Sequence, residues 1–419
     1  MKPLKYLFIS SMLFVATSCG NSWLDLEPST SVDTETSIKI LSDVEFTLNG
    51  IYSTMQSSDA YSGRLVYYGD VTGDDMQAVS STKRVANYYR FNFTKDDNPS
   101  SHWSYLYSII QNCNLILMNI DKLVIDEDDK AYRDDLKGEA LAIRGLALFD
   151  LTRIFGYPYL KDNGASLGVP IIEGLSTIDS KPTRNTVAQC YTKIIDDLTQ
   201  SLSLLGEKFN KGKINKWGAM VLLSRVYLYK GENANALKMA SDAIIGAEKN
   251  KYALWTNEDY PTAWGEDASA SKPGEVLFEI VNLTTDSPGK ESMGYLNSYD
   301  GYDDMCITCS FYQFLKEDPK DIRLKLLSFD KKYYAYVNKY QPQREENIED
   351  ANIPLIRLSE AYLNAAEAAV KENDNDAAVK YLDPIVKRAN PDNTVVGQTI
   401  TLELSLIHIS EPTRHSLIS

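Results

Sequence analysis

The sequence predicts a mostly α-helical fold in which tetratricopeptide-like helical hairpins carry long loop-rich insertions. Three observations lead to this prediction. Apolar residues recur with helical spacing along most of the chain, two pairs of helical segments resemble each other, and two long regions lack that spacing. The chain has 419 residues, of which 43% are hydrophobic and 24% charged, as in ordinary globular proteins. This composition argues against a disordered chain, a collagen or a coiled-coil rod.

The N-terminal 18 residues have the pattern of a signal peptide. Two lysines precede an apolar stretch at residues 7–15, which is too short to span a bilayer. Small residues at 16–18 then lead to Cys19, an arrangement that resembles a lipobox, in which the cysteine is acylated after cleavage. We therefore expect residues 1–18 to be removed and Cys19 to carry a lipid anchor, with plain secretion as the alternative.

The charge balance disfavours nucleic acid as a partner. The chain has 43 basic and 58 acidic residues, a net charge of −15. Removal of the signal peptide takes away two lysines and leaves 41 basic against 58 acidic residues, or −17. No later stretch is apolar enough to cross a membrane, so the mature protein is expected to be anchored to the membrane and not to span it.

The clearest helical periodicity lies around residues 136–155. One apolar stripe runs from Leu136 to Ile154 with i, i+3 or i+4 spacing, and Leu141, Leu148 and Phe155 mark a second stripe. Two apolar stripes predict a helix that packs on both sides, and Gly156 is expected to end it. Further helices are expected at about 103–121, 186–205, 213–230, 234–247, 355–371 and 375–389.

Two of the predicted helix pairs look like copies of each other. The segment LSRVYL at 223–228 matches LSEAYL at 358–363 with an offset of 135 residues, and 236–240 matches 378–382 with an offset of 142. The difference of 7 residues is about two helical turns and keeps the same faces aligned. Alanines recur where the helices would approach each other. This pattern predicts hairpins that bury their faces by stacking.

Two long regions, about 55–100 and 250–310, are expected to be irregular and to carry the binding residues. They are rich in tyrosine, which the chain uses 27 times against 12 Phe and 5 Trp. Aromatic rings that carry a hydroxyl can pack and hydrogen-bond at once, as exposed binding surfaces require. The alternative is that these tyrosines pack the loops onto the scaffold. The candidate residues are Arg84, Asn87, Tyr88, Tyr89, Tyr295, Asn297, Tyr299 and Tyr302.

Catalytic and metal sites are not expected. Before residue 404 the only histidine is His102, which argues against a Ser-His-Asp triad or a multi-histidine metal site. The acidic run 126–129 is interpreted as the solvated start of a helix and not as a calcium site. Cys306 and Cys309 are interpreted as two thiols or a local disulfide, because no second pair completes a zinc site. No cofactor is expected.

Several segments together resemble the SusD/RagB family of nutrient-binding outer-membrane lipoproteins. The resemblance covers residues 19–403 and is most specific in the helix that ends at Gly156. The matching segments, in order, are Cys19 with Trp23–Pro28, Glu139–Gly156, Trp217–Gly231, Ile353–Ala368 and Lys387–Pro391.

The resemblance implies a helical protein with tetratricopeptide-like pairs and a loop-rich binding surface. It implies a cell-surface lipoprotein of the outer membrane that captures oligo- or polysaccharide and delivers it to a partner, a SusC-like TonB-dependent transporter. The family domain is expected at 19–403, with an N-terminal part at about 19–210 and a truncated C-terminal part at about 211–403. The alternatives are a lipid-anchored scaffold that binds only protein partners and a glycosidase that uses paired carboxylates.

Residues 404–419 depart from the family pattern. They contain two of the three histidines and read like a translated sequencing adapter joined to a truncated gene. We therefore expect 404–419 to be a non-native tail, and an apolar face that the last helices would cover to be left bare.

Overall fold

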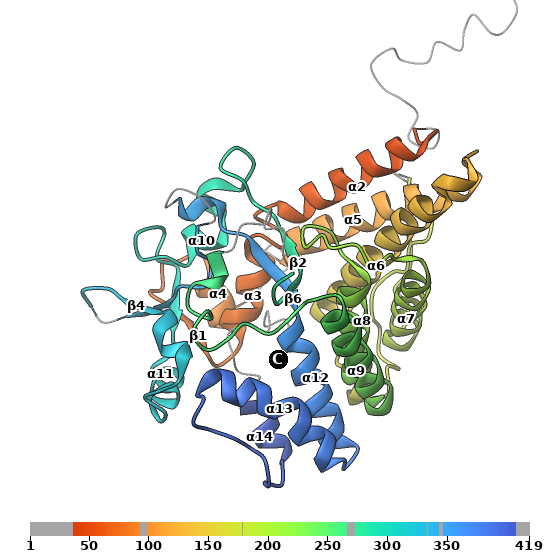
Figure 1. Cartoon of the computed structure of the whole chain (residues 1–419). Coiled ribbons are helices and arrows are strands. Elements are labelled where there is room, and N and C mark those ends of the chain that lie inside the picture. Colours follow the sequence, from red (N-terminus) through yellow and green to blue (C-terminus); the bar gives the residue numbers. More distant parts are fainter. Residues whose placement is uncertain are drawn as a thin grey trace, which may run out of the picture.

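The protein is described by a computed structural model that covers residues 37–92, 99–177, 179–265, 273–332, 334–342 and 347–407 (Figure 1). The fold is mostly helical, as predicted. The helices are α2 (Leu41–Gln56), α3 (Arg64–Thr72), α4 (Ala86–Tyr89), α5 (Pro99–Asn119), α6 (Lys130–Phe155), α7 (Val187–Leu204), α8 (Lys216–Lys230), α9 (Asn233–Lys249), α10 (Met293–Leu296), α11 (Cys309–Lys316), α12 (Leu358–Lys371), α13 (Asn375–Ala389) and α14 (Leu402–Ile407). The short strands are β1 (Met76–Ala78), β2 (Val276–Ile280), β3 (Met305–Ile307), β4 (Leu327–Phe329), β5 (Ala335–Val337) and β6 (Ile353–Arg357).

The helices that the periodicity predicts are confirmed, with ends shifted by a few residues. Helix α12 begins three residues later than predicted, because residues 353–357 form β6 and pair antiparallel with β2. Polar N-caps set other starts. Thr186 accepts a hydrogen bond from the Gln189 amide before α7, and Asn215 accepts one from the Gly218 amide before α8.

Helix α6 is buried along most of its length. Its residues from Gly138 to Thr152 are all buried, which agrees with the two apolar stripes in the sequence. The helix packs between α5 and α7 and ends before Gly156. The acidic run 126–129 directly precedes α6 and is exposed, as expected for a solvated helix start.

The two similar helix pairs form neighbouring hairpins, α8–α9 and α12–α13, and α12 packs against both α8 and α9 (Figure 1). Arg225 and Glu360 occupy equivalent positions of the two repeats, and their side chains form a buried two-pronged ion pair with N–O distances of 2.6 and 2.7 Å. Close approach requires small residues. A Cβ atom on Gly246 of α9 would lie 2.0 Å from the Trp217 ring of α8, so this position admits only glycine.

The two regions expected to be irregular contain more secondary structure than the sequence indicated. The first contains α3, β1 and α4, and the second contains β2, α10 and β3. Helix α2 was also not predicted. The elements β1, β3, α4 and α10 have only three or four residues, which is too short to show a periodic pattern. In Figure 1, α3, β1, α4 and α10 lie on the side of the molecule opposite α7, α8 and α9.

The cysteines of the described residues are free thiols, with Cys113, Cys190 and Cys306 buried and Cys309 exposed. In the described part of the chain, no group of His, Cys, Asp and Glu side chains could hold a metal ion. The same part contains no helix that is both long enough and apolar enough to cross a membrane. Cys19 and residues 408–419 lie outside the described residues.

Candidate functional site

A short antiparallel ladder joins the two tyrosine-rich regions. Strand β1 pairs with β3, with Met76 opposite Ile307 and Ala78 opposite Met305. The amide of Val79 extends this contact and donates a hydrogen bond of 3.2 Å to the carbonyl oxygen of Asp304. The ladder places the segment around Arg84 beside the segment around Tyr302, although the two are far apart in the sequence.

Arg84 is the centre of the resulting cluster. Its guanidinium carbon lies 3.6 Å from the centroid of the Tyr302 ring, within cation–π distance. The same guanidinium lies 3.1 Å from a carboxylate oxygen of Asp304 and 3.6 Å from one of Glu291. Partial burial alone would lower the pKa of Arg84, but the two carboxylates raise it above its ordinary value. Arg84 is therefore held as a cation against the aromatic ring.

Tyr295 and Lys83 hold Tyr302 from two further directions. The Tyr295 and Tyr302 rings meet edge to face, with centroids 5.0 Å apart. Lys83 donates a hydrogen bond of 2.6 Å to the Tyr302 carbonyl oxygen, and its ammonium lies 3.4 Å from the Asp303 carboxylate. Both rings remain partly exposed. The Tyr302 ring is thus fixed in position and still reaches solvent.

Tyr299 extends this aromatic surface. Its side chain is 46% exposed, and its ring centroid lies 5.9 Å from that of Tyr336. Tyr336 is buried and its hydroxyl donates a hydrogen bond to Asp303. Burial, followed by this hydrogen bond, raises the pKa of Tyr336 above its ordinary value. Tyr299 therefore rests on a neutral, buried ring and presents its own ring to solvent.

Neighbouring residues of α4 differ in how far they are exposed to solvent. Tyr88 is 1% exposed and packs against Tyr67 and Tyr68, with ring centroids 5.9 and 5.3 Å away. Tyr89 is 38% exposed and Asn87 is also exposed. In this arrangement Tyr88 contributes to the core, while Asn87 and Tyr89 are available at the surface.

Asn297 is the second candidate that lies below the surface. It is 5% exposed, and its amide nitrogen donates a hydrogen bond of 2.8 Å to the carbonyl oxygen of Val337. This bond links the α10 segment to β5. Its role in the present arrangement is to hold the loop that carries Tyr295 and Tyr299.

Apart from Arg84, the charged residues of the cluster were not predicted from the sequence. Asp303 and Asp304 follow Tyr302 directly, and Lys83 precedes Arg84, so two adjacent cations face two adjacent anions. Two adjacent basic residues in one loop region and two adjacent acidic residues in the other could have indicated that the two regions are in contact. Burial raises the pKa of Asp304, whereas Arg84 lowers it.

The described residues around this cluster do not provide the parts of a hydrolytic triad. His102 is fully buried, and its Nδ1 atom lies 3.1 Å from the carbonyl oxygen of Asp59. Burial lowers the pKa of His102, so the ring is neutral near pH 7. The carboxylates of Asp303 and Asp304 are paired with cations. What the cluster offers is aromatic faces beside hydrogen-bonding groups, which is the chemistry of a binding surface.

Two profiles of the same protein family match the N-terminal and the C-terminal parts of the chain. The family profile described as "Starch-binding associating with outer membrane" matches residues 22–228, and the profile described as "SusD family" matches residues 326–407. Among curated proteins, the SusD-like protein P2 of Formosa agariphila is 28% identical over 313 residues, which cover 72% of this chain and 57% of the relative. The chain spans about half the length of the curated relatives it matches.

Two solved structures from Bacteroides vulgatus are similar over nearly the whole chain. A putative sugar binding protein is 79% identical with a TM-score of 0.89, and the match covers 91% of this chain and 85% of that one. A SusD superfamily protein is 37% identical with a TM-score of 0.84, and the match covers 91% of this chain and 87% of that one. With both its sequence and its helical framework shared in this way, the chain belongs to the SusD superfamily.

Proposed function

We propose that this protein is a cell-surface lipoprotein that captures an oligo- or polysaccharide and delivers it to a SusC-like TonB-dependent transporter of the outer membrane. Proteins of the SusD family bind carbohydrate, associate with the outer membrane and are not catalysts, which supports the first part of the proposal. The observation that carries it is the surface formed by Tyr295, Tyr299 and Tyr302 around Arg84.

The chemistry of this surface suits a sugar. The rings offer apolar faces to the C–H groups of a pyranose, and Asn87 and the tyrosine hydroxyls can exchange hydrogen bonds with its hydroxyls. Because Arg84 and Tyr295 hold the Tyr302 ring in place, little side-chain freedom is lost when a ligand binds.

The ligand is proposed to be uncharged. The mature protein has a net charge of −17 and therefore repels anions. In addition, Arg84 and Lys83 are already paired with carboxylates. Binding should therefore change little with salt, since a neutral sugar releases no counterions.

The test is a panel of neutral polysaccharides in affinity electrophoresis, followed by calorimetry with the polysaccharide that retards the wild type. Tyr299→Ala and Tyr302→Ala should weaken binding about tenfold or more, which corresponds to about 1.4 kcal/mol. The matched control is Tyr157→Ala, because Tyr157 is also exposed but lies beyond α6 and outside the cluster. The melting temperature of each variant checks that the fold is intact.

Two outcomes would contradict the proposed site. If the variants at Tyr299 and Tyr302 bind as tightly as wild type, the glycan binds elsewhere. If no polysaccharide of the panel binds while the transporter is retained in pull-down experiments, the protein is a scaffold for protein partners. A strong salt dependence of binding would show that the ligand is charged.

The proposed anchor is tested separately. Cys19→Ser should move the protein from the membrane fraction to the soluble fraction, because the acylated thiol is lost. If the variant remains in the membrane after a carbonate wash, the lipid-anchor proposal is wrong.

A further inference from the structure

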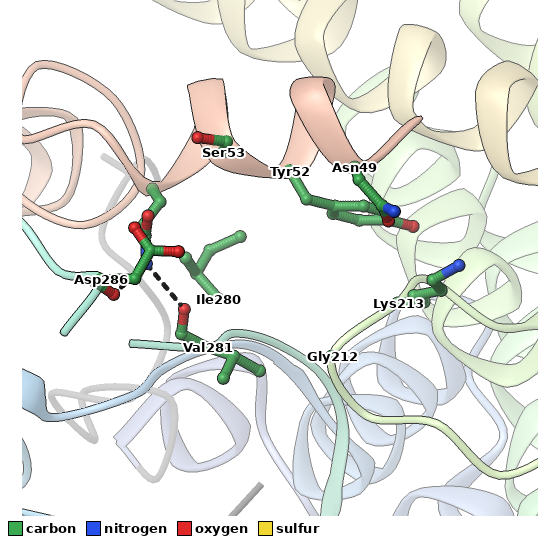
Figure 2. A pocket seen from close by; sticks show the side chains of 9 residues that line it. Asn49, Tyr52, Ser53, Gly212, Lys213, Ile280, Val281 and Asp286 are labelled. Atoms are coloured by element: carbon green, nitrogen blue, oxygen red, sulfur yellow. Dashed lines mark hydrogen bonds between the residues drawn. The ribbon is translucent and has the colours of Figure 1, made fainter. Parts of the chain in front are cut away.

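A hollow beside α2 is lined by none of the residues of the Arg84–Tyr302 cluster. It has a volume of about 190 Å³ and opens between α2, the connection from α7 to α8 and the end of β2 (Figure 2). The residues whose polar side chains line it are Asn49, Tyr52, Ser53, Gln56, Lys213 and Asp286.

Opposite charges stand on opposite sides of this hollow. In Figure 2, Lys213 and Asn49 lie on one side and Asp286 on the other. The ammonium of Lys213 is 3.9 Å from a carboxylate oxygen of Glu45, and its side chain is 26% exposed. The residues Asn49, Ser53 and Asp286 are exposed, so the hollow is open to solvent. It therefore offers hydrogen-bond donors and acceptors without a strong net charge.

Hydrogen bonds hold the walls of the hollow in place. The Gln56 amide nitrogen donates to the carbonyl oxygens of Val281 and Asp286, at 3.1 and 2.7 Å, and so ties α2 to the segment after β2 (Figure 2). The Tyr52 hydroxyl donates to Glu139 at 2.8 Å and accepts from the Ile214 amide at 3.1 Å. With its hydroxyl used in this way, Tyr52 presents its ring to the hollow.

An exposed aromatic ring stands beside the polar groups. Phe46 is 81% exposed and lies one helical turn before Asn49, so both are on the same face of α2. Gly50 lies on this face as well, and a Cβ atom added to it would meet nothing within 4 Å. Phe46 is therefore an exposed aromatic side chain next to Asn49 on the helix face that borders the hollow.

We infer that this hollow is a second carbohydrate-binding site, which takes a single uncharged, hydroxyl-rich sugar unit. The choice of ligand class rests on the proposed function, whereas the site itself rests on the geometry around Lys213 and Asp286. Sugar hydroxyls both donate and accept hydrogen bonds, and so match an ammonium and an amide on one side and a carboxylate on the other. The volume is below that of pockets for drug-sized ligands, which favours one ring over a longer chain.

An anionic ligand fits this site less well. Asp286 lies on its wall and Glu45 lies near it, and Lys213 is a cation that faces both. Lys213 already lies close to Glu45. The site is thus expected to prefer a neutral sugar to a uronic acid.

The experiment separates this site from the loop cluster. The starting protein is the Arg84→Ala, Tyr302→Ala double variant, in which the cluster is disabled. The probes are the methyl glycosides of glucose, galactose, mannose and xylose, with glucuronate as the charged comparison, and binding is followed by saturation-transfer NMR titration. We expect at least one neutral glycoside to bind the double variant, and Lys213→Met on this background to weaken its binding about tenfold.

Two further variants make the result decisive. Ser53→Leu, which places an apolar side chain in the hollow, should also weaken binding, while Lys249→Met on the exposed face of α9 should leave it unchanged. The inference is overturned if no neutral glycoside binds the double variant, if binding is insensitive to both Lys213→Met and Ser53→Leu, or if glucuronate binds more tightly. Failure of the polysaccharide panel with wild-type protein would instead contradict the proposed function.

Discussion

The guanidinium carbon of Arg84 lies 3.6 Å from the centroid of the Tyr302 ring, and this contact joins the two loop regions of the candidate site. A cation over an aromatic face contributes about 0.5–2 kcal/mol, depending on how far both groups are removed from water. The carboxylates of Asp304 and Glu291 also hold the guanidinium, at N–O distances of 3.1 and 3.6 Å. Arg84 is therefore a positioning residue for Tyr302.

The first prediction tests this positioning role. Arg84→Gln should lower glycan affinity about tenfold, because the Tyr302 ring loses the cation that holds it, and Arg84→Lys should restore part of the affinity. Calorimetry measures both, with Arg133→Gln on α6 as a control for loss of a surface arginine. Equal affinities for wild type and Arg84→Gln would show that Tyr302 does not depend on Arg84.

The second prediction uses the neighbours Tyr88 and Tyr89 as a matched pair. Tyr88 is fully packed, so Tyr88→Ala should lower the free energy of unfolding by about 3 kcal/mol or more through the cavity it leaves. Tyr89 is 38% exposed, so Tyr89→Ala should change stability by less than about 1 kcal/mol. Urea denaturation of the two variants measures the difference. A stable Tyr88→Ala protein would contradict the packing of α4 described above.

The third prediction concerns pH. Burial raises the pKa of Glu139 from its ordinary 4.5 to about 7, while the Lys213 charge and the Tyr52 hydrogen bond lower it in part. Between these two values the folded state retains a proton that the unfolded state has released. Stability contributed by Glu139 is therefore full below pH 4.5 and falls as the pH rises toward 7, by at most about 3 kcal/mol.

Glu139→Gln removes the titration and keeps an oxygen that accepts from Tyr52. Urea denaturation at several pH values between 5 and 7 should show wild type losing stability relative to this variant as the pH rises. Parallel curves for the two proteins would show that Glu139 does not titrate in this range.

The fourth prediction concerns the C-terminal residues. Helix α14 packs against α12, and within it Leu404 is partly buried against the core and Ser405 is 1% exposed. Deletion of residues 408–419 should therefore leave the melting temperature unchanged, whereas deletion from Leu402 onward should lower it, because the α12 surface beneath α14 becomes exposed. Thermal melts followed by circular dichroism compare the two deletions. Residues 404–407 of the expected tail at 404–419 lie in α14. A large loss of stability on deletion of 408–419 alone would refute the expectation for the rest of that tail.

Local sequence was sufficient to predict α5 to α9, α12 and α13, but it did not indicate α2 or α3. The stripes of α6 and the matched segments in α8 and α12 follow from the 3.6-residue period, which depends only on near neighbours. The repeat offset even placed Arg225 and Glu360 at equivalent positions, although it did not indicate that the two side chains would pair. The family could likewise be identified from motifs that are continuous in the chain.

The tertiary structure alone decided which candidate residues share a surface. Arg84 meets Tyr302 because β1 pairs with β3, and a three-residue ladder leaves no periodic signal in either segment. Tyr88 is buried and Tyr89 exposed because α4 turns one side toward Tyr67 and Tyr68, which identical residue types cannot reveal. The hollow beside Lys213 likewise exists only where α2, the α7–α8 connection and the end of β2 meet. Contacts between distant segments depend on how the whole chain packs, so the sequence determined the scaffold and the class of binding residue, and the tertiary structure determined the sites.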